Sequence, residues 1–232
     1  MASLSEVFNK LTFIFLALLL VVIMAGELIL EPRHLATWPA FLIMIFYFMS
    51  HMNIKEAPAI LIGSAFGLLN LVLITYFLGV IVPMMGGDMA KATDPHNAEI
   101  IFIGKLIYIA IFVAAIVFFK DIVPWVFNNY AFMCFTVAGA VSAGYTVATI
   151  AAHTVAGYAN AVVAKGGNPE AIAAMKAATD KAIAASVPHV NVFEWIGIEL
   201  IGGGIFIAAI YGINKLVTKL AMAAAAKNNV QG

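Results

Sequence analysis

The recurrence of apolar segments of membrane-spanning length constrains this chain more than any other feature. A helix needs ~20 apolar residues to cross the hydrocarbon core of a bilayer, and within lipid its backbone must satisfy its own hydrogen bonds. Five segments are long enough and a sixth is short; in chain order they are 11–30, 36–52 (the short one), 57–85, 99–119, one that starts near Pro124, and 190–220. The sequence therefore predicts an all-α integral membrane protein with six transmembrane helices, in which residues 1–232 form a single membrane domain.

The composition points the same way. Hydrophobic residues make up 64% of the 232 residues and charged residues 10%, against ~25% charged in typical soluble domains. A soluble fold would leave this excess of apolar surface exposed to water. The formal net charge of 0 excludes a polybasic protein that gathers phosphates. We expect the lipid bilayer as a partner and no nucleic acid.

Residues 124–164 are too long for one span. A single helix of that length would measure roughly 60 Å at ~1.5 Å per residue, about twice the hydrocarbon thickness. Glycines at 139–144 lower helix propensity, and the Gly-Gly-Asn-Pro sequence at 166–169 is a stop signal. We predict that residues 140–188 form an inserted, external, Ala-rich helical hairpin between spans five and six. The alternative is a seventh span over 140–163.

The orientation follows from the basic residues. With six spans both termini share one face, whose charged residues are Lys10, Lys55, Lys120, Lys215, Lys219, Lys227, Glu6, Glu56 and Asp121. The opposite face carries six basic and nine acidic residues, and three of its lysines lie in the long hairpin. Lysine and arginine in short loops mark the cytoplasmic side. This predicts a multi-pass membrane protein with both termini cytoplasmic.

The two halves of the chain resemble each other. The Thr-Trp-Pro-Ala-Phe sequence at 37–41 is echoed by Val-Pro-Trp-Val-Phe at 123–127, and Leu-Ile-Gly-Ser at 61–64 is echoed by Leu-Ile-Gly-Gly at 200–203. Three spans per half would make these inverted repeats, an arrangement common among transporters. The alternative is that these motifs are ordinary features of membrane segments.

Several of these motifs carry a family resemblance. The sequence at 38–41, the aromatic pair at 47–48, Lys55 and the small-residue span from Gly63 resemble the first half of small bacterial inner-membrane proteins of domain-of-unknown-function family ten ninety-seven. Val123-Pro124, Phe127, Phe132 and Ala138-Gly139 are similar to its second half. The resemblance covers most of the chain except 140–188. The resemblance implies a fold and a place in the bacterial inner membrane, and it supplies no catalytic residues.

Glu199 is the most informative single residue. It lies roughly ten residues into the last span and is followed by Gly202, Gly203 and Gly204. A charged group at this depth costs ~2.5–3.5 kcal/mol on insertion scales, so it normally faces a bundle interior or a water-filled cavity. Glu199 is either a proton or cation site in a pathway or a structural carboxyl. Glu194, nearer the outer end of the same span, is a further pathway candidate at the interface.

Small and amide residues mark further positions. Gly63 and Gly67 form a small-xxx-small motif, and the glycines 202–204 are its counterpart, so we expect spans three and six to cross closely there. Asn70 lies in the middle of span three, and Asn128 and Asn129 begin span five. Asparagine in lipid needs a partner, which is either another helix or a polar solute.

No pattern for catalysis or a cofactor is present. The chain contains no His/Cys cluster with zinc spacing, no phosphate-binding glycine loop and no serine triad pattern. Its one cysteine, Cys134, lies in an apolar run, where a thiol packs as a small hydrophobic group. We expect no metal, no cofactor and no enzymatic activity.

Two functions remain. The first is a membrane channel or secondary transporter for a small polar solute or ion, working as a homo-oligomer, with Glu199 beside the pathway. The alternative is a non-catalytic membrane subunit or scaffold of a larger complex. In that case the small-residue face of the external hairpin would be the docking element; its members are Gly144, Ala148, Ala152 and Ala156.

Overall fold

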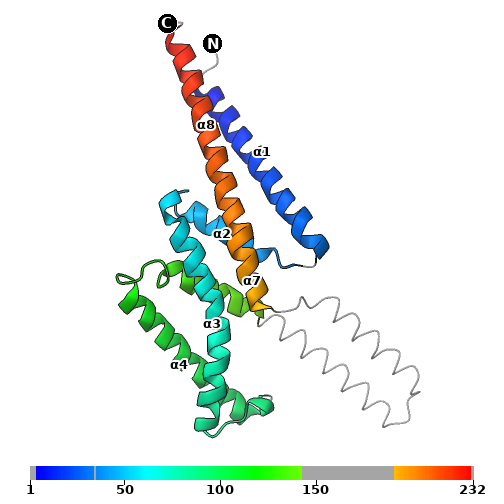
Figure 1. Ribbon diagram of the computed structural model, residues 1–232, viewed down its shortest axis with the longest axis vertical. Coiled ribbons are helices and arrows are strands. Elements are labelled where there is room, and N and C mark those ends of the chain that lie inside the picture. Colours follow the sequence, from blue (N-terminus) through cyan, green and yellow to red (C-terminus); the bar gives the residue numbers. More distant parts are fainter. Residues whose placement is uncertain (1–3, 34, 93, 143–190, 231–232) are drawn as a thin grey trace, which may run out of the picture.

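The computed structural model of the chain describes residues 4–33, 35–92, 94–142 and 191–230 (Figure 1). Every regular element among these residues is helical. The predicted all-α class is confirmed, and its long apolar helices are those of a multi-pass membrane protein.

Four helices are long and apolar enough to cross a membrane. They are α1 (Leu4–Leu30), α3 (Ala57–Met84), α4 (Pro95–Phe119), and a last, continuous helix formed by α7 (Val192–Ile198), a π-helical segment (Glu199–Gly203) and α8 (Gly204–Val230). Short 3₁₀ turns flank them at Glu31–Arg33, Ile54–Glu56 and Met89–Lys91. These four correspond to the first, third, fourth and sixth predicted spans.

Two further apolar helices are shorter. They are α2 (Trp38–Met49) and the helix Asn129–Ser142. The second starts later than Pro124, the predicted start of span five, because the side chain of Asn128 accepts a hydrogen bond from the backbone N–H of Ala131 (3.0 Å) and thereby caps the helix at Asn129. The predicted external hairpin of residues 140–188 lies, apart from 140–142, outside the described residues.

Polar caps fix where other helices begin. Asp94 accepts a hydrogen bond from the backbone N–H of His96 (2.9 Å) at the start of α4, and Pro95 occupies the first turn, where its missing N–H is tolerated. Asn191 caps α7 in the same way, accepting from the backbone N–H of Glu194 (3.3 Å). Short-range sequence chemistry therefore sets these boundaries.

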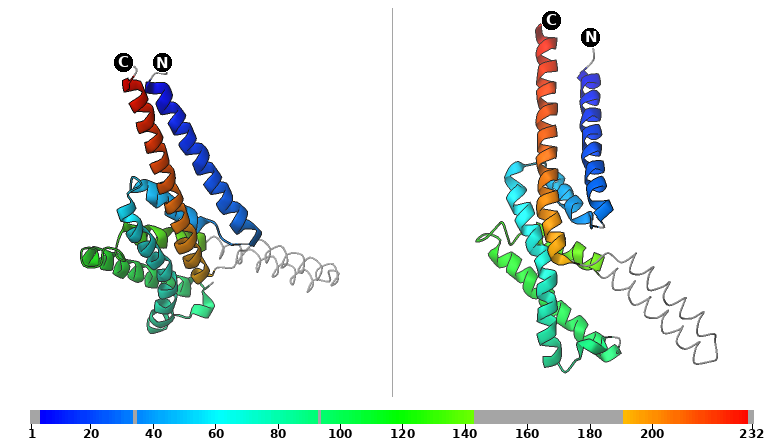
Figure 2. Two further views of the ribbon diagram at one scale, coloured as in Figure 1. Left: turned by 45° about the horizontal axis from the view of Figure 1, so that its top comes forward. Right: turned by 45° about the vertical axis from the view of Figure 1, so that its right-hand side comes forward.

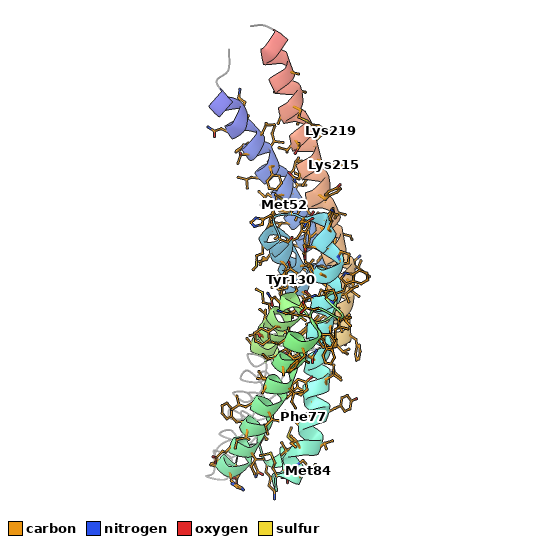
Figure 3. All side chains as sticks on the ribbon, turned by 90° about the vertical axis from the view of Figure 1, so that its left-hand side faces the viewer. Met52, Phe77, Met84, Tyr130, Lys215 and Lys219 are labelled. Carbon is orange, nitrogen blue, oxygen red and sulfur yellow. The ribbon has the colours of Figure 1, made fainter. Side chains whose placement is uncertain are left out.

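The long helices are arranged as two antiparallel pairs. α1 packs along α8, and α4 packs along α3. The two pairs extend toward opposite ends of the molecule, with both termini at the α1/α8 end (Figures 1 and 2). Figure 3 shows Lys215 and Lys219 on the α8 side beyond Met52, whereas Phe77 and Met84 mark the opposite end of α3. α2 and the helix Asn129–Ser142 lie between the pairs, where the main core forms.

The main core joins the middle elements. Its buried members come from α2, α3, the helix Asn129–Ser142, α7 and α8, and they are Ile43, Phe46, Tyr47, Ile60, Leu68, Cys134, Ala138, Trp195, Ile207 and Ile210. An edge-to-face pair of Trp38 and Trp195, with ring centroids 5.0 Å apart, joins the start of α2 to α7. The first and last thirds of the described chain are thus held together at the level of Glu199.

Gly67 sets the closest crossing of α3 with the helix Asn129–Ser142. A Cβ atom at Gly67 would collide with the carbonyl oxygen of Ala131, which belongs to a helical backbone and cannot move aside. We therefore predict that Gly67→Ala lowers the free energy of unfolding by ~1–3 kcal/mol, as overpacking of a dense core does.

Gly79 on the same helix is the matched control, because a Cβ there meets nothing within 4 Å. Gly79→Ala should leave stability equal or raised by up to ~1 kcal/mol. Unfolding in mixed micelles with increasing sodium dodecyl sulfate measures both variants. Equal stability of the two variants would contradict this account of the crossing.

Candidate functional site

The last membrane helix changes its winding in its apolar part. Residues Glu199–Gly203 form one π-helical turn between α7 and α8. π turns are rare, occur mostly as single bulges within α-helices and are frequent at functional sites. This turn carries Glu199 on one side and places Gly202 and Gly203 against α2, so it is the local feature from which the candidate site is built.

Glu199 is sealed from the surface. Its exposed fraction is 0%, and that of Ser64 on α3 is also 0%. Cys134 Sγ donates to Glu199 Oε1 across 3.9 Å, the long contact expected of a weak thiol donor. Ser64 lies close enough to the Glu199 carboxyl to interact with it electrostatically, although the pair does not reach hydrogen-bond geometry. Three separate helical elements thus supply the carboxyl, the thiol and the hydroxyl.

Two oxygen atoms of this group lack a protein partner. Glu199 Oε2 and Ser64 Oγ make no hydrogen bond to any described residue. The one ion pair among the described residues joins Lys91 to Asp88, far along the chain from this site. Buried polar groups are nearly always hydrogen-bonded, so unsatisfied ones call for an explanation. Among the described residues, the carboxyl group therefore has Ser64 and Cys134 as polar neighbours and no cation.

The glycines of the π turn pack against α2. A Cβ at Gly203 would lie 2.7 Å from Ile43 Cβ, and one at Gly202 would lie 3.1 Å from Ala40 Cβ. At Gly204 a Cβ meets nothing within 4 Å. The last helix also packs against α3, through α7 and the π turn. The glycines of the π turn themselves contact Ala40 and Ile43 of α2, however, and not the glycines of α3.

The glycines of α3 meet the fifth helical segment. A Cβ at Gly63 would collide with the side-chain amide of Asn128, and one at Gly67 with the backbone at Ala131. Asn128 Nδ2 donates to the carbonyl oxygens of Ala59 (3.0 Å) and Pro124 (2.9 Å). Asn128 therefore ties the start of its helix to α3 through the space that Gly63 leaves. Asn129 is exposed and points away from this contact region.

Asn70 is paired with a second helix. Its exposed fraction is 2%. Asn70 Oδ1 accepts a hydrogen bond from Tyr108 Oη of α4 (2.7 Å), while its Nδ2 donates to the carbonyl oxygen of Phe66 (2.7 Å). Of the amides predicted to line a pathway, Asn70 and Asn128 thus bind protein partners. Their role in transport stays a prediction.

An apolar cavity of about 610 Å³ lies on another side of the last helix. Its wall comes from α1, the start of α2, α7, the π turn and α8. Among the described residues of this wall, Glu194 is the one ionisable residue; Ile198, Ile201 and Gly202 belong to the wall as well, whereas Glu199 does not. The π turn therefore separates a sealed carboxyl from a lateral cavity.

Comparisons of the chain with family models, with curated proteins and with solved structures gave no match. The resemblance to domain-of-unknown-function family ten ninety-seven stays a prediction. Function must be argued from the geometry alone.

The neighbours of Glu199 are not evident from the sequence. Ser64 lies between Gly63 and Gly67 in the small-residue motif, and Cys134 lies in an apolar run, yet both face the carboxyl. The sequence offers one sign of these neighbours: Ser64 and Cys134 are each an isolated small polar residue in an apolar span. Among the described residues no group of three His, Cys, Asp or Glu side chains could hold a metal ion.

The Asn70–Tyr108 bond allows a quantitative test. We predict that Tyr108→Phe and Asn70→Leu, combined in a double-mutant cycle, show a coupling energy of ~0.6–1.7 kcal/mol, the range measured for hydrogen bonds between membrane helices. Unfolding of the four proteins in mixed micelles gives the cycle. Strictly additive effects would show that the bond contributes nothing to the docking of α4.

Proposed function

We propose that this protein is a secondary membrane transporter in which Glu199 binds the coupling proton. The observation that supports this most is the buried carboxyl on a π turn, where one carboxyl oxygen and the nearby hydroxyl of Ser64 have no hydrogen-bond partner among the described residues. An occluded site fits alternating access, in which a binding group is closed to both sides for part of the cycle. A continuously open channel would leave such a group hydrated.

The proton assignment rests on the surroundings of Glu199. An isolated carboxylate buried in apolar protein is very unfavourable, and such a group becomes neutral instead. No basic side chain among the described residues pairs with Glu199. In the sealed state Glu199 therefore holds a proton on its carboxyl. When the π turn moves and water reaches the site, the proton leaves and the carboxylate remains hydrated.

The contacts between helices support the proposal of inverted repeats. If α1, α2 and α3 correspond to α4, the helix Asn129–Ser142 and the α7–α8 helix, the packing is reciprocal. α1 packs on α8 and α4 packs on α3. The α3 glycines meet the second helix of the other half, and the π-turn glycines meet α2, the second helix of the first half. Sites at such repeat interfaces are common in transporters, and Glu199 and Ser64 occupy equivalent helices.

The membrane placement completes the proposal. We infer that α2 and the helix Asn129–Ser142 are membrane elements too, which makes six spans, and that both termini are cytoplasmic in a bacterial inner membrane. The position of Lys215 and Lys219 at the end of the molecule that carries both termini agrees with a basic cytoplasmic face (Figure 3). A homo-oligomer remains part of the proposal. The scaffold alternative depends on a hairpin outside the described residues.

Exchange of a solute for a proton tests the function. Proteoliposomes that contain a pH-sensitive dye receive, in separate trials, a small inorganic cation, an inorganic anion, a neutral polyol and an alkylammonium ion. At least one probe should drive proton movement in the wild type. Glu199→Gln keeps the size and hydrogen-bonding capacity of the side chain without a titrating proton, so that signal should fall by about tenfold or more.

Glu99→Gln, at an exposed site on α4, is the matched control and should behave as the wild type. A wild type silent with all four probes, or a Glu199→Gln protein as active as the wild type, overturns the proposal. Infrared difference spectra between acid and alkaline conditions give a second readout. They should show the carbonyl band of a protonated carboxylic acid in the wild type and lack it in Glu199→Gln.

Cys134 offers an independent report on opening of the site. It is the one cysteine of the sequence, has an exposed fraction of 1% and contacts Glu199. We predict slow reaction with N-ethylmaleimide at rest and reaction about tenfold faster while a pH gradient drives exchange, because thiol reactivity requires access. Mass spectrometry of the intact protein follows the reaction. Rapid labelling at rest would contradict a sealed site.

A further inference from the structure

The lateral cavity is built for an apolar guest. Its volume of about 610 Å³ lies within the range of ~300–1,000 Å³ typical of small-molecule sites. Ala25 and Gly26 of α1 and Gly197 and Gly202 of the last helix belong to its wall. These small residues leave space between the two helices, and the surface turned toward the cavity is almost entirely apolar. A polar solute would lose its hydration there without replacement.

Among the described residues, Glu194 is the acidic residue of the cavity wall, and it is partly buried. Its carboxylate has no ion pair or side-chain hydrogen bond among the described residues. The adjoining end of α1 and its 3₁₀ turn add Glu27 and Glu31. The one cation of this segment, Arg33, donates a hydrogen bond to the backbone carbonyl of Ile29. Among the described residues, Glu194 and this adjoining segment thus carry three carboxylates and one guanidinium, which makes this the acidic end of the cavity.

We propose that the cavity binds a cationic amphiphile, with its alkyl chain between α1 and the last helix and its ammonium head beside Glu194. The chain matches the apolar wall, and the head matches the acidic end. A guest of this kind partitions into the bilayer and enters from the side, where the cavity lies between two apolar helices.

This assignment names a substrate class for the transporter and in that respect rests on the proposed function. The physical link is the π turn. Ile201 and Gly202 line the cavity, and Glu199 of the same turn carries the buried carboxyl. A change in the winding of this turn alters the cavity and the surroundings of Glu199 together, which is what coupling of a guest to a proton requires.

The experiment measures binding without transport. Purified protein in nanodiscs of phosphatidylcholine is exposed to three photoactivatable probes with the same dodecyl chain, which end in trimethylammonium, hydroxyl or sulfate. The ammonium probe should label the wild type most, on peptides that cover residues 22–35 and 194–209. Equal labelling by all three probes would overturn the assignment of the head group.

Gly197→Phe tests the place of binding. Gly197 lines the cavity, and a Cβ there meets nothing within 4 Å, so a large side chain enters the open space without a clash. Labelling by the ammonium probe should fall about tenfold, the effect of losing ~1.4 kcal/mol of binding. Gly204→Phe, on the same helix with equally free surroundings but outside the cavity wall, is the matched control and should label as the wild type does.

Glu194→Gln tests the head group. It should reduce ammonium labelling by about fivefold and leave hydroxyl labelling unchanged, in keeping with a partly exposed ion pair. Undiminished labelling of Gly197→Phe, or a change in its oligomeric state that shows a second copy in the cavity, overturns the proposal. Glu199→Gln should still bind the ammonium probe, so loss of exchange in that variant tests the proposed function and leaves this inference intact.

Discussion

The absence of side chains at a few glycines is the constraint on which the rest of this structure depends. Gly63 and Gly67 admit the start of the fifth helical segment to the surface of α3, and Gly203 admits Ile43 of α2 to the last helix. Backbones that approach this closely exclude lipid and gain dispersion contacts, the main source of helix association in membranes. Glu199 is buried because these two contacts close around it from different sides.

The π turn connects this packing to the buried carboxyl of Glu199 and to the lateral cavity. Its winding spaces residues 199–203 around the helix axis differently from an α-helix. As built, Glu199 faces Ser64 and Cys134, Gly203 faces α2, and Ile201 faces the lateral cavity. Five consecutive residues therefore contact three different surroundings. A rearrangement of the turn would change all three sets of contacts.

The sequence predicts some of this and not the rest, for physical reasons. Hydropathy over ~20 residues identifies α1, α3, α4 and the last helix, because insertion depends on local composition. Glu199 stands out because a carboxyl is costly at that depth. Its partners do not stand out, because Ser64 and Cys134 are small residues tolerated anywhere in a span. Which glycine meets which helix depends on the arrangement of all the helices in space, and Gly204, so similar in sequence to Gly203, packs against nothing.

In the proposed six-span arrangement, the shortness of two helices has a mechanical consequence for the surrounding lipid. α2 has 12 residues, and at 1.5 Å per residue it extends about 18 Å, well below the ~30 Å thickness of the hydrocarbon core. Acyl chains beside such a helix must tilt or shorten, so the bilayer thins locally. The helix Asn129–Ser142 would impose the same deformation on the other flank. The insulating layer is then narrowest around the middle of the molecule, which lowers the electrostatic work of moving a charge to its centre and brings both aqueous phases nearer to it.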